Sequence, residues 1–361
     1  MGRENKSIVS IYAFSFLVTA LVFLGVGFYS GPAALLTVLV LSALEITFSF
    51  DNAVVNAKVL QKMPEFWQKM FLTVGIVIAV FGMRLVLPIL LVSLTAGLSM
   101  GDVVRLALEH PSEYARYLTD AHPIIASFGG IFLLMIFMEF ILDYGRKIHW
   151  FRALERPLMK IGRLRQVAPL LSLTILVAVT EFLGGEHKFT VLIAGVLGII
   201  TYLAIRSLAE VFELKQEKEL KHTIIDRRML MRAGFVNFLY LELLDASFSF
   251  DGVIGAFAIT NMVLLIAAGL GVGAMWVRSM TIHIVRHNTL LRYRYLDHGA
   301  HYAIGALAVM LLLGIRYEIH EAITGSIGIL IIGFAFFSSW RYNVTHKPEK
   351  VEGFKHHADH A

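Results

Sequence analysis

The sequence predicts an all-α polytopic membrane protein with about ten transmembrane helices in two inverted-topology repeats. Three observations lead to this prediction: the composition is strongly apolar, long apolar segments recur along the chain, and one acidic motif occurs twice. Hydrophobic residues make up 57% of the 361 residues, charged residues make up 16%, and the mean hydropathy is +0.70. Soluble globular domains rarely have this balance.

Apolar segments of about 20 residues, the length that crosses a bilayer as a helix, recur along the whole chain. Arg3 and Lys6 precede the first segment as in a signal peptide, but its apolar run is long and no small-residue cleavage site is evident. We therefore expect a retained helix. The fifth segment is the weakest candidate. The expected spans are 8–28, 33–57, 71–96, 123–143, 168–183, 189–208, 233–258, 261–281, 301–316 and 322–340.

Basic residues concentrate in alternate loops, chiefly 144–167 and 209–232. Because cytoplasmic loops carry the excess of Lys and Arg, both termini are expected in the cytoplasm and the protein in a bacterial inner membrane. Loop placement also explains the net charge of +5, so membrane lipids are the expected partners and nucleic acid is not. Protein partners are not indicated. The chain has no cysteine, which excludes disulfides, thiolate metal sites and thiol catalysis.

An acidic motif occurs twice, 200 residues apart: residues 44–56 read LEITFSFDNAVVN and residues 244–256 read LDASFSFDGVIGA. An odd number of predicted crossings separates the two copies, so they must run in opposite directions. Inverted repeats of this kind form transporters with a substrate site near the bilayer midplane. We expect repeat halves at 1–183 and 184–341. A polar cytoplasmic tail is expected at 342–361.

The repeated motif carries carboxylates, which cost at least about 2.5 kcal/mol each to bury in a membrane and usually mark an ion or proton path. Their oxygen ligands, with neighbouring hydroxyls and an amide, suit Mn²⁺, Mg²⁺ or Ca²⁺. On an ideal helix Glu45, Ser49 and Asn52 share one polar stripe, whereas Asp51 lies on another side. The motif helices are therefore either buried on all sides or unwound near Phe-Ser-Phe-Asp. The candidate metal ligands are Glu45, Ser49, Asp51, Asn52, Glu242, Asp245, Ser249 and Asp251.

These residues resemble the TerC-like integral membrane proteins, in the wider group that includes the Alx-type manganese exporters. The first half of that family carries an L-E-x-x-x-S-x-D-N-A-like motif, seen here at 44–53, and the second half carries E-x-x-D-x-x-F-S-x-D, seen here at 242–251. The resemblance implies export of a divalent metal, with Mn²⁺ favoured. The chain departs from the family at residues 252–255, which read GVIG where many relatives have Ser and Pro, and in its larger number of spans.

We therefore expect a non-enzymatic secondary transporter that exports a divalent cation, Mn²⁺ above others, with proton exchange as the plausible coupling. Asp51 and Asp251 would ligate the cation, Asn52 and backbone carbonyls would complete the shell, and Glu45, Asp245 or Glu242 would share protons or tune the charge. Mn²⁺ is then the substrate, and no tightly bound cofactor is expected.

Several alternatives stay open on the sequence. The acids could pair with Arg84, Arg278 or one another and only lock the helices together. The protein could export a small organic cation or amino acid, with Phe48 and Phe248 among the aromatic walls. It could deliver metal to exported enzymes as a membrane chaperone. An aspartyl protease dyad is the enzymatic alternative, but no Gly-x-Gly stretch of the protease type precedes either aspartate.

Overall fold

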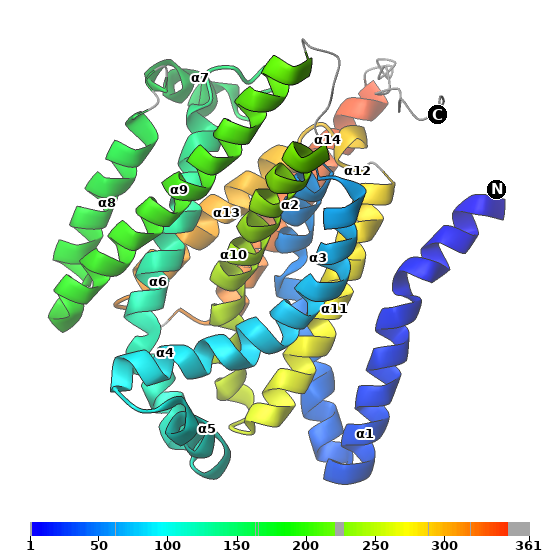
Figure 1. The fold of residues 1–361 in the computed structure, drawn as a ribbon, viewed down its shortest axis with the longest axis vertical. Coiled ribbons are helices and arrows are strands. Elements are labelled where there is room, and N and C mark those ends of the chain that lie inside the picture. The colour runs from blue at the N-terminus through cyan, green and yellow to red at the C-terminus, as the bar shows by residue number, and fades with distance from the viewer. Residues whose placement is uncertain are drawn as a thin grey trace.

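The computed structural model describes residues 2–61, 63–162, 164, 166–220, 227–287, 289–317 and 319–345, and this part of the chain contains helices and no strands. Figure 1 shows a bundle of long helices. In chain order they are α1 (Gly2–Phe48), α2 (Phe50–Leu60), α3 (Glu65–Val77), the π-helix η1 (Ile78–Val86), α4 (Leu87–Ala96), α5 (Met100–Glu109), α6 (Pro111–Leu142), α7 (Arg152–Ile161), α8 (Val167–Leu183), the 3-10 helix η2 (Gly185–His187), α9 (Lys188–Leu220), α10 (Arg227–Ile259), α11 (Val263–Arg286), α12 (Thr289–Arg292), α13 (Leu296–Gly314) and α14 (Glu321–Thr345).

Seven helical segments within the described residues are long and apolar enough to cross a membrane, which fits the predicted all-α membrane class. Of the other predicted spans, 168–183 coincides with the shorter apolar helix α8 of 17 residues, and 233–258 lies within α10. The seven segments are Ile11–Phe48, Glu65–Ala96, Pro111–Leu142, Gly185–Val211, Val263–Arg286, Leu296–Gly314 and Ala322–Thr345.

The first of these segments is divided by a sharp bend at Gly31, where φ is +82° and ψ is 178°. Glycine adopts this left-handed conformation without steric cost, and Pro32 next to it has no backbone N–H to continue the helix. The chain therefore reverses direction at the lower end of the view in Figure 1. The predicted span 8–28 lies in the first arm of α1. The predicted span 33–57 begins in the second arm, which leads into the first acidic motif.

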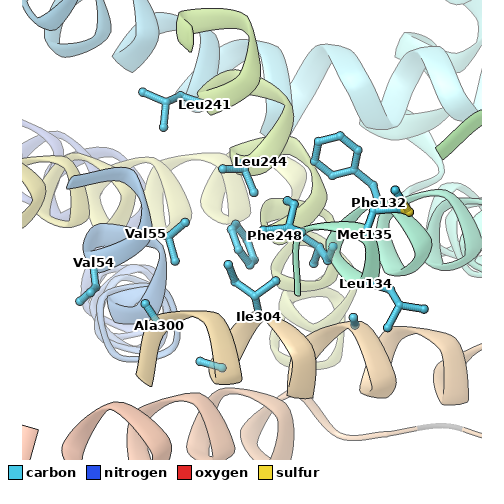
Figure 2. Close-up of a cluster of buried hydrophobic side chains, with 14 of the residues drawn as sticks. Val54, Val55, Phe132, Leu134, Met135, Leu241, Leu244, Phe248, Ala300 and Ile304 are labelled. Carbon is cyan, nitrogen blue, oxygen red and sulfur yellow. The ribbon is translucent and has the colours of Figure 1, made fainter. Parts of the chain in front are cut away.

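The core lies where α2, α6, α10 and α13 meet, and Figure 2 shows the side chains that fill it. Val55, Phe132, Leu244 and Ile304, one from each helix, are all nearly inaccessible to solvent. The outer helices behave differently, since α8 and α9 expose large apolar side chains such as Phe182. An apolar outer surface around a packed interior is what lipid-facing helices require.

Two short amphipathic helices, α5 and α7, join spanning helices rather than crossing themselves. The α7 helix lies in the basic loop 144–167 and turns Arg156 outward while it buries Glu155. At the other end of the chain, α14 continues to Thr345, four residues into the predicted polar tail. Residues 346–361 of that tail lie outside the described residues.

Candidate functional site

A pocket of about 70 Å³ lies inside the bundle, among the second arm of α1, α2, α10, α11, α13 and α14. This volume holds a few water molecules, because one water needs about 10–15 Å³ on the same scale. The polar groups of the pocket come mainly from the first motif, and its remaining wall is apolar or glycine. Its lining includes Glu45, Ser49, Asp51, Asn52, Thr324, Phe48, Phe248, Gly252, Ala303, Leu307, Gly325 and Gly328.

Asp51 is the buried carboxylate of this pocket that lacks a cationic partner among the described side chains. Its Oδ1 accepts the backbone N–H of Asn52 at 2.9 Å, and its side chain is 8% exposed in total. The Oδ1 of Asn52 is also buried and accepts no hydrogen bond from the described residues. Buried polar atoms without partners are costly, so water or a ligand in the pocket would satisfy the free oxygen of Asn52.

A local irregularity at Ser49 brings Asp51 into the same pocket as Glu45. On an ideal helix residues six apart point about 120° away from each other, but α1 ends at Phe48 and α2 begins at Phe50. Ser49 between them has φ −98° and ψ 17°. The hydrogen bonds from Ser49 N to Glu45 O, 2.9 Å, and from Ala53 N to Ser49 O, 3.4 Å, are kept. The first motif is thus kinked rather than unwound, and α10 runs through the second motif without a break.

Glu45 is already neutralised by an arginine from the next spanning segment. Its Oε1 receives Arg84 Nη2 at 2.5 Å and Ser49 Oγ at 3.1 Å, and both charged side chains are at most 7% exposed. Arg84 lies in η1, a nine-residue π-helix, and donates its other Nη to the Ala79 carbonyl at 2.5 Å. Wide helical turns of this kind are rare and frequent at functional sites.

Two acids of the second motif, Asp245 and Glu242, lie beside one arginine, Arg278 of α11. Arg278 Nη2 lies 2.8 Å from Asp245 Oδ2 and 3.5 Å from Glu242 Oε1, and Nη1 donates to the Phe71 carbonyl at 2.6 Å. The second oxygen of Asp245 accepts Asn56 Nδ2 at 3.1 Å, which links this group to the helix of Asp51. Each motif therefore holds an acid–arginine pair inside the bundle, as the helix-locking alternative expects.

Six of the eight predicted ligands thus lie in two groups: Glu45, Ser49, Asp51 and Asn52 at the pocket, and Glu242 and Asp245 at Arg278. Ser249 is buried, but it does not line the pocket and its hydroxyl has no hydrogen-bond partner among the described residues. Asp251 lies within α10, and its side chain is outside the described part of the structure. Over the described residues, no three His, Cys, Asp or Glu side chains come close enough together to hold a metal ion.

Glycines shape the space around the acids, and the sequence reasoning did not assign them this role. A Cβ at Gly252, the counterpart of Asn52, would lie 3.3 Å from Glu45 Oε2. A Cβ at Gly328 would lie 3.2 Å from Asp51 Oδ2. The clue at position 252 was visible in the repeat, because glycine stands where the first copy has an amide. The role of Gly328 depends on how α14 packs, and no sequence motif indicates that packing.

The two ends of the pocket differ. It reaches Ile259, the last residue of α10, and Thr324, in the first turn of α14, so it extends toward the bundle end opposite to the C-terminus of α14. Toward the other end, Lys58 Nζ of α2 lies 2.7 Å from Asp297 Oδ1 of α13. The apolar core shown in Figure 2 packs in the same region, where the side chains of Val55 from α2 and Ile304 from α13 lie between the two helices.

The comparisons with curated proteins and with solved structures give no match. The sequence profile described as "Protein of unknown function (DUF475)" matches residues 50–346. This range begins inside the first motif and includes the second motif, both arginines and all the helices that follow. The chain belongs to the DUF475 family.

Proposed function

We propose that this protein is a secondary transporter that exports a divalent metal cation, with Mn²⁺ favoured, through the pocket that holds Asp51. The observation that carries the proposal is a buried carboxylate beside a buried amide oxygen, neither of which has a cationic or hydrogen-bond donor side chain as partner among the described residues, both at a cavity inside an apolar helix bundle. Ionisable groups at such positions generally serve ion or proton paths. Exchange for protons is the coupling we propose to test.

The chemistry of the pocket favours a hard cation. Glu45, Asp51, Asn52 and Ser49 offer only oxygen atoms, which Mn²⁺ and Mg²⁺ prefer and which copper and zinc prefer less. Two carboxylates completed by neutral oxygens and water bind more weakly than a closed structural site. Weak binding suits transport, because the ion has to leave as well as enter. The resemblance to TerC-like proteins favours Mn²⁺ among the hard cations.

The arrangement of the two motifs supports an inverted repeat of five plus five spans, divided near 183/184. In Figure 1 the chain rises through the second arm of α1 and α2 and descends through α10, so the two copies run in opposite directions. In each half, an acid of the motif pairs with an arginine of the next spanning segment, Glu45 with Arg84 and Asp245 with Arg278. Transporters built this way alternate access around a central site.

We place the protein in a bacterial inner membrane with both termini cytoplasmic. The support is the basic loop 144–167, where α7 exposes Arg152, Arg156 and Lys160 near the ends of α6 and α8. The pocket would then extend toward the outer face in the conformation described here.

Mn²⁺ flux into liposomes that contain the purified protein tests this function, with an internal metal-sensitive dye and an imposed pH gradient. Asp51→Asn and Asp251→Asn should each abolish flux while the protein remains folded. Asp120→Asn, at an exposed position of α6, is the matched control and should keep wild-type flux. Full activity of Asp51→Asn would refute the assignment of this pocket.

A small organic cation is the second candidate, because Phe48 and Phe248 line the same pocket as the acids. Aromatic faces attract organic cations, but a cavity of about 70 Å³ is small for an amino acid. Competition between simple amines and Mn²⁺ for binding separates the two candidates. Retained Mn²⁺ binding without flux would instead favour a metal-delivery role.

A further inference from the structure

We propose that Arg84 is a built-in counter-ion that occupies Glu45 in the cation-free protein and that the transported cation must displace it to bind. This inference rests on the proposed function, since it describes how the same pocket exchanges its positive charge. Three features of the site carry it: the placement of Arg84, the charge balance of the pocket and the incomplete hydrogen bonding of the arginine.

Arg84 binds Glu45, one of the two carboxylates that line the pocket, but Arg84 itself is not part of the lining. The guanidinium therefore approaches Glu45 from η1, on the side away from the pocket. Asp51 lies on the pocket side. Glu45 presents one oxygen to Arg84 and Ser49, and its other oxygen, Oε2, faces the space left by Gly252. A cation in the pocket and Arg84 would thus share one carboxylate from two sides.

The charge balance of the pocket favours replacement of Arg84 by the cation over simultaneous binding of both to Glu45. Glu45 and Asp51 together balance one divalent cation, but only if the guanidinium of Arg84 has left Glu45. With Arg84 still in place, the site would carry an excess positive charge at low dielectric, where like charges repel strongly. Without the cation, Glu45 would be an isolated buried anion unless Arg84 returned. The divalent cation thus replaces the guanidinium of Arg84 as the positive partner of Glu45.

The hydrogen bonding of Arg84 is incomplete. Its Nε is buried and has no partner among the described residues, and one Nη is held by a carbonyl of its own helix, Ala79. The π-helical segment η1 leaves backbone geometry that can relax to ordinary α-helix and re-aim the side chain. Arg278 is similar in part, because its Nε also has no partner among the described residues and its Nη1 donates to a carbonyl, that of Phe71 in α3.

Mn²⁺ binding to the purified protein, measured by calorimetry, tests the proposal with four variants. Arg84→Met should bind Mn²⁺ at least about tenfold more tightly than the wild type, because the competitor is gone, a coupling in the usual range. Its flux should fall, since nothing displaces the cation on the way out. Arg84→Lys keeps a competing charge and should stay nearer the wild type.

Two further variants exclude trivial explanations. Arg84→Met/Glu45→Gln removes both charges of the pair, so it should fold even if Arg84→Met does not, and its gain in affinity should vanish. Arg278→Met removes the same charge from the other half, whose acids do not line the pocket, and should raise Mn²⁺ affinity less than Arg84→Met does.

The outcomes separate this inference from the proposed function. If the wild type and Asp120→Asn bind Mn²⁺ and folded Arg84→Met binds it equally or more weakly, Arg84 is no competitor and the inference fails while the function stands. If neither the wild type nor any Arg84 variant binds Mn²⁺, the proposed function fails and the inference with it. Tighter binding in both Arg84→Met and Arg278→Met to the same extent would show a general field effect and would also overturn the inference.

Discussion

Glu45 packs directly against Gly273 of α11, so closely that a Cβ at position 273 would lie 2.4 Å from the Cβ of Glu45. The second motif repeats this contact, since a Cβ at Gly75 of α3 would lie 2.6 Å from Glu242 Oε1 and 2.5 Å from an Nη of Arg278. Glu45 of the first motif therefore lies against a glycine of α11, and Glu242 beside the second motif lies against a glycine of α3. Glycine is needed at position 273, because the backbone of Ser42 and the stem of Glu45 lie too close for a side chain, whereas the atoms nearest to Gly75 are the ends of the Glu242 and Arg278 side chains.

The first prediction concerns this contact. Gly273→Ala should destabilise the protein by about 1–3 kcal/mol, the usual cost of overpacking a closed contact. Thermal unfolding in detergent measures the change. Gly333→Ala in α14 is the control, because nothing lies within 4 Å of its added Cβ, and it should be neutral or slightly stabilising. Equal stability of the two variants would mean that α1 and α11 are not packed as described.

The second prediction concerns the pocket wall at α14. Gly328→Ala would place a methyl group 3.2 Å from Asp51 Oδ2 and should weaken Mn²⁺ binding by about 1 kcal/mol, or roughly fivefold. Calorimetry measures the affinity, and Gly333→Ala on the same helix serves again as the control. An unchanged affinity in Gly328→Ala would place the cation away from Asp51.

The third prediction concerns Glu155, a fully buried acid that fastens α7 to the bundle. It accepts hydrogen bonds from Arg146 at 3.1 Å and from Tyr302 at 3.2 Å, as well as two backbone N–H groups. Glu155→Ala should cost about 3–5 kcal/mol, because it leaves Arg146 charged and buried without its partner.

The control for Glu155 is Glu181, whose pair with Lys188 is exposed to solvent. Glu181→Ala should change the free energy of unfolding by no more than about 1 kcal/mol, since exposed ion pairs contribute little. Unfolding of both variants in detergent gives the comparison. A small effect in Glu155→Ala would show that α7 is held by its apolar contacts instead.

The fourth prediction concerns the two ends of the pocket and uses the absence of cysteine from the chain. A single cysteine at Thr324 should react with a membrane-impermeant thiol reagent added on the side opposite the termini. A single cysteine at Ala300, which is 2% exposed and lies in the core beyond the pocket, should react from neither side. Labelling of Ala300→Cys from the side of the termini would show that this end is open.

Much of the architecture could be predicted because apolar length and helix formation are local properties. Each segment long enough to cross a membrane must satisfy its own backbone, which only a helix does. The predicted spans lie in helical segments, although 33–57 crosses the break at Ser49 and 71–96 runs through α3, η1 and α4. The bend at Gly31 also follows from local chemistry, since glycine and proline stand together there. The number of membrane crossings does not follow so directly, because α8 has only 17 residues.

The site was predicted in part. Sequence by itself determined that Glu45, Asp51, Asp245 and Asp251 are exceptional, because buried carboxylates are costly wherever the chain folds. The tertiary structure decided which acids receive an arginine and that Glu45 and Asp51 line the pocket. The non-helical backbone of Ser49 places Asp51 in the pocket that Glu45 also lines. The π-helix η1 places Arg84 beside Glu45. These outcomes depend on helix geometry and on distant packing, which a motif does not encode.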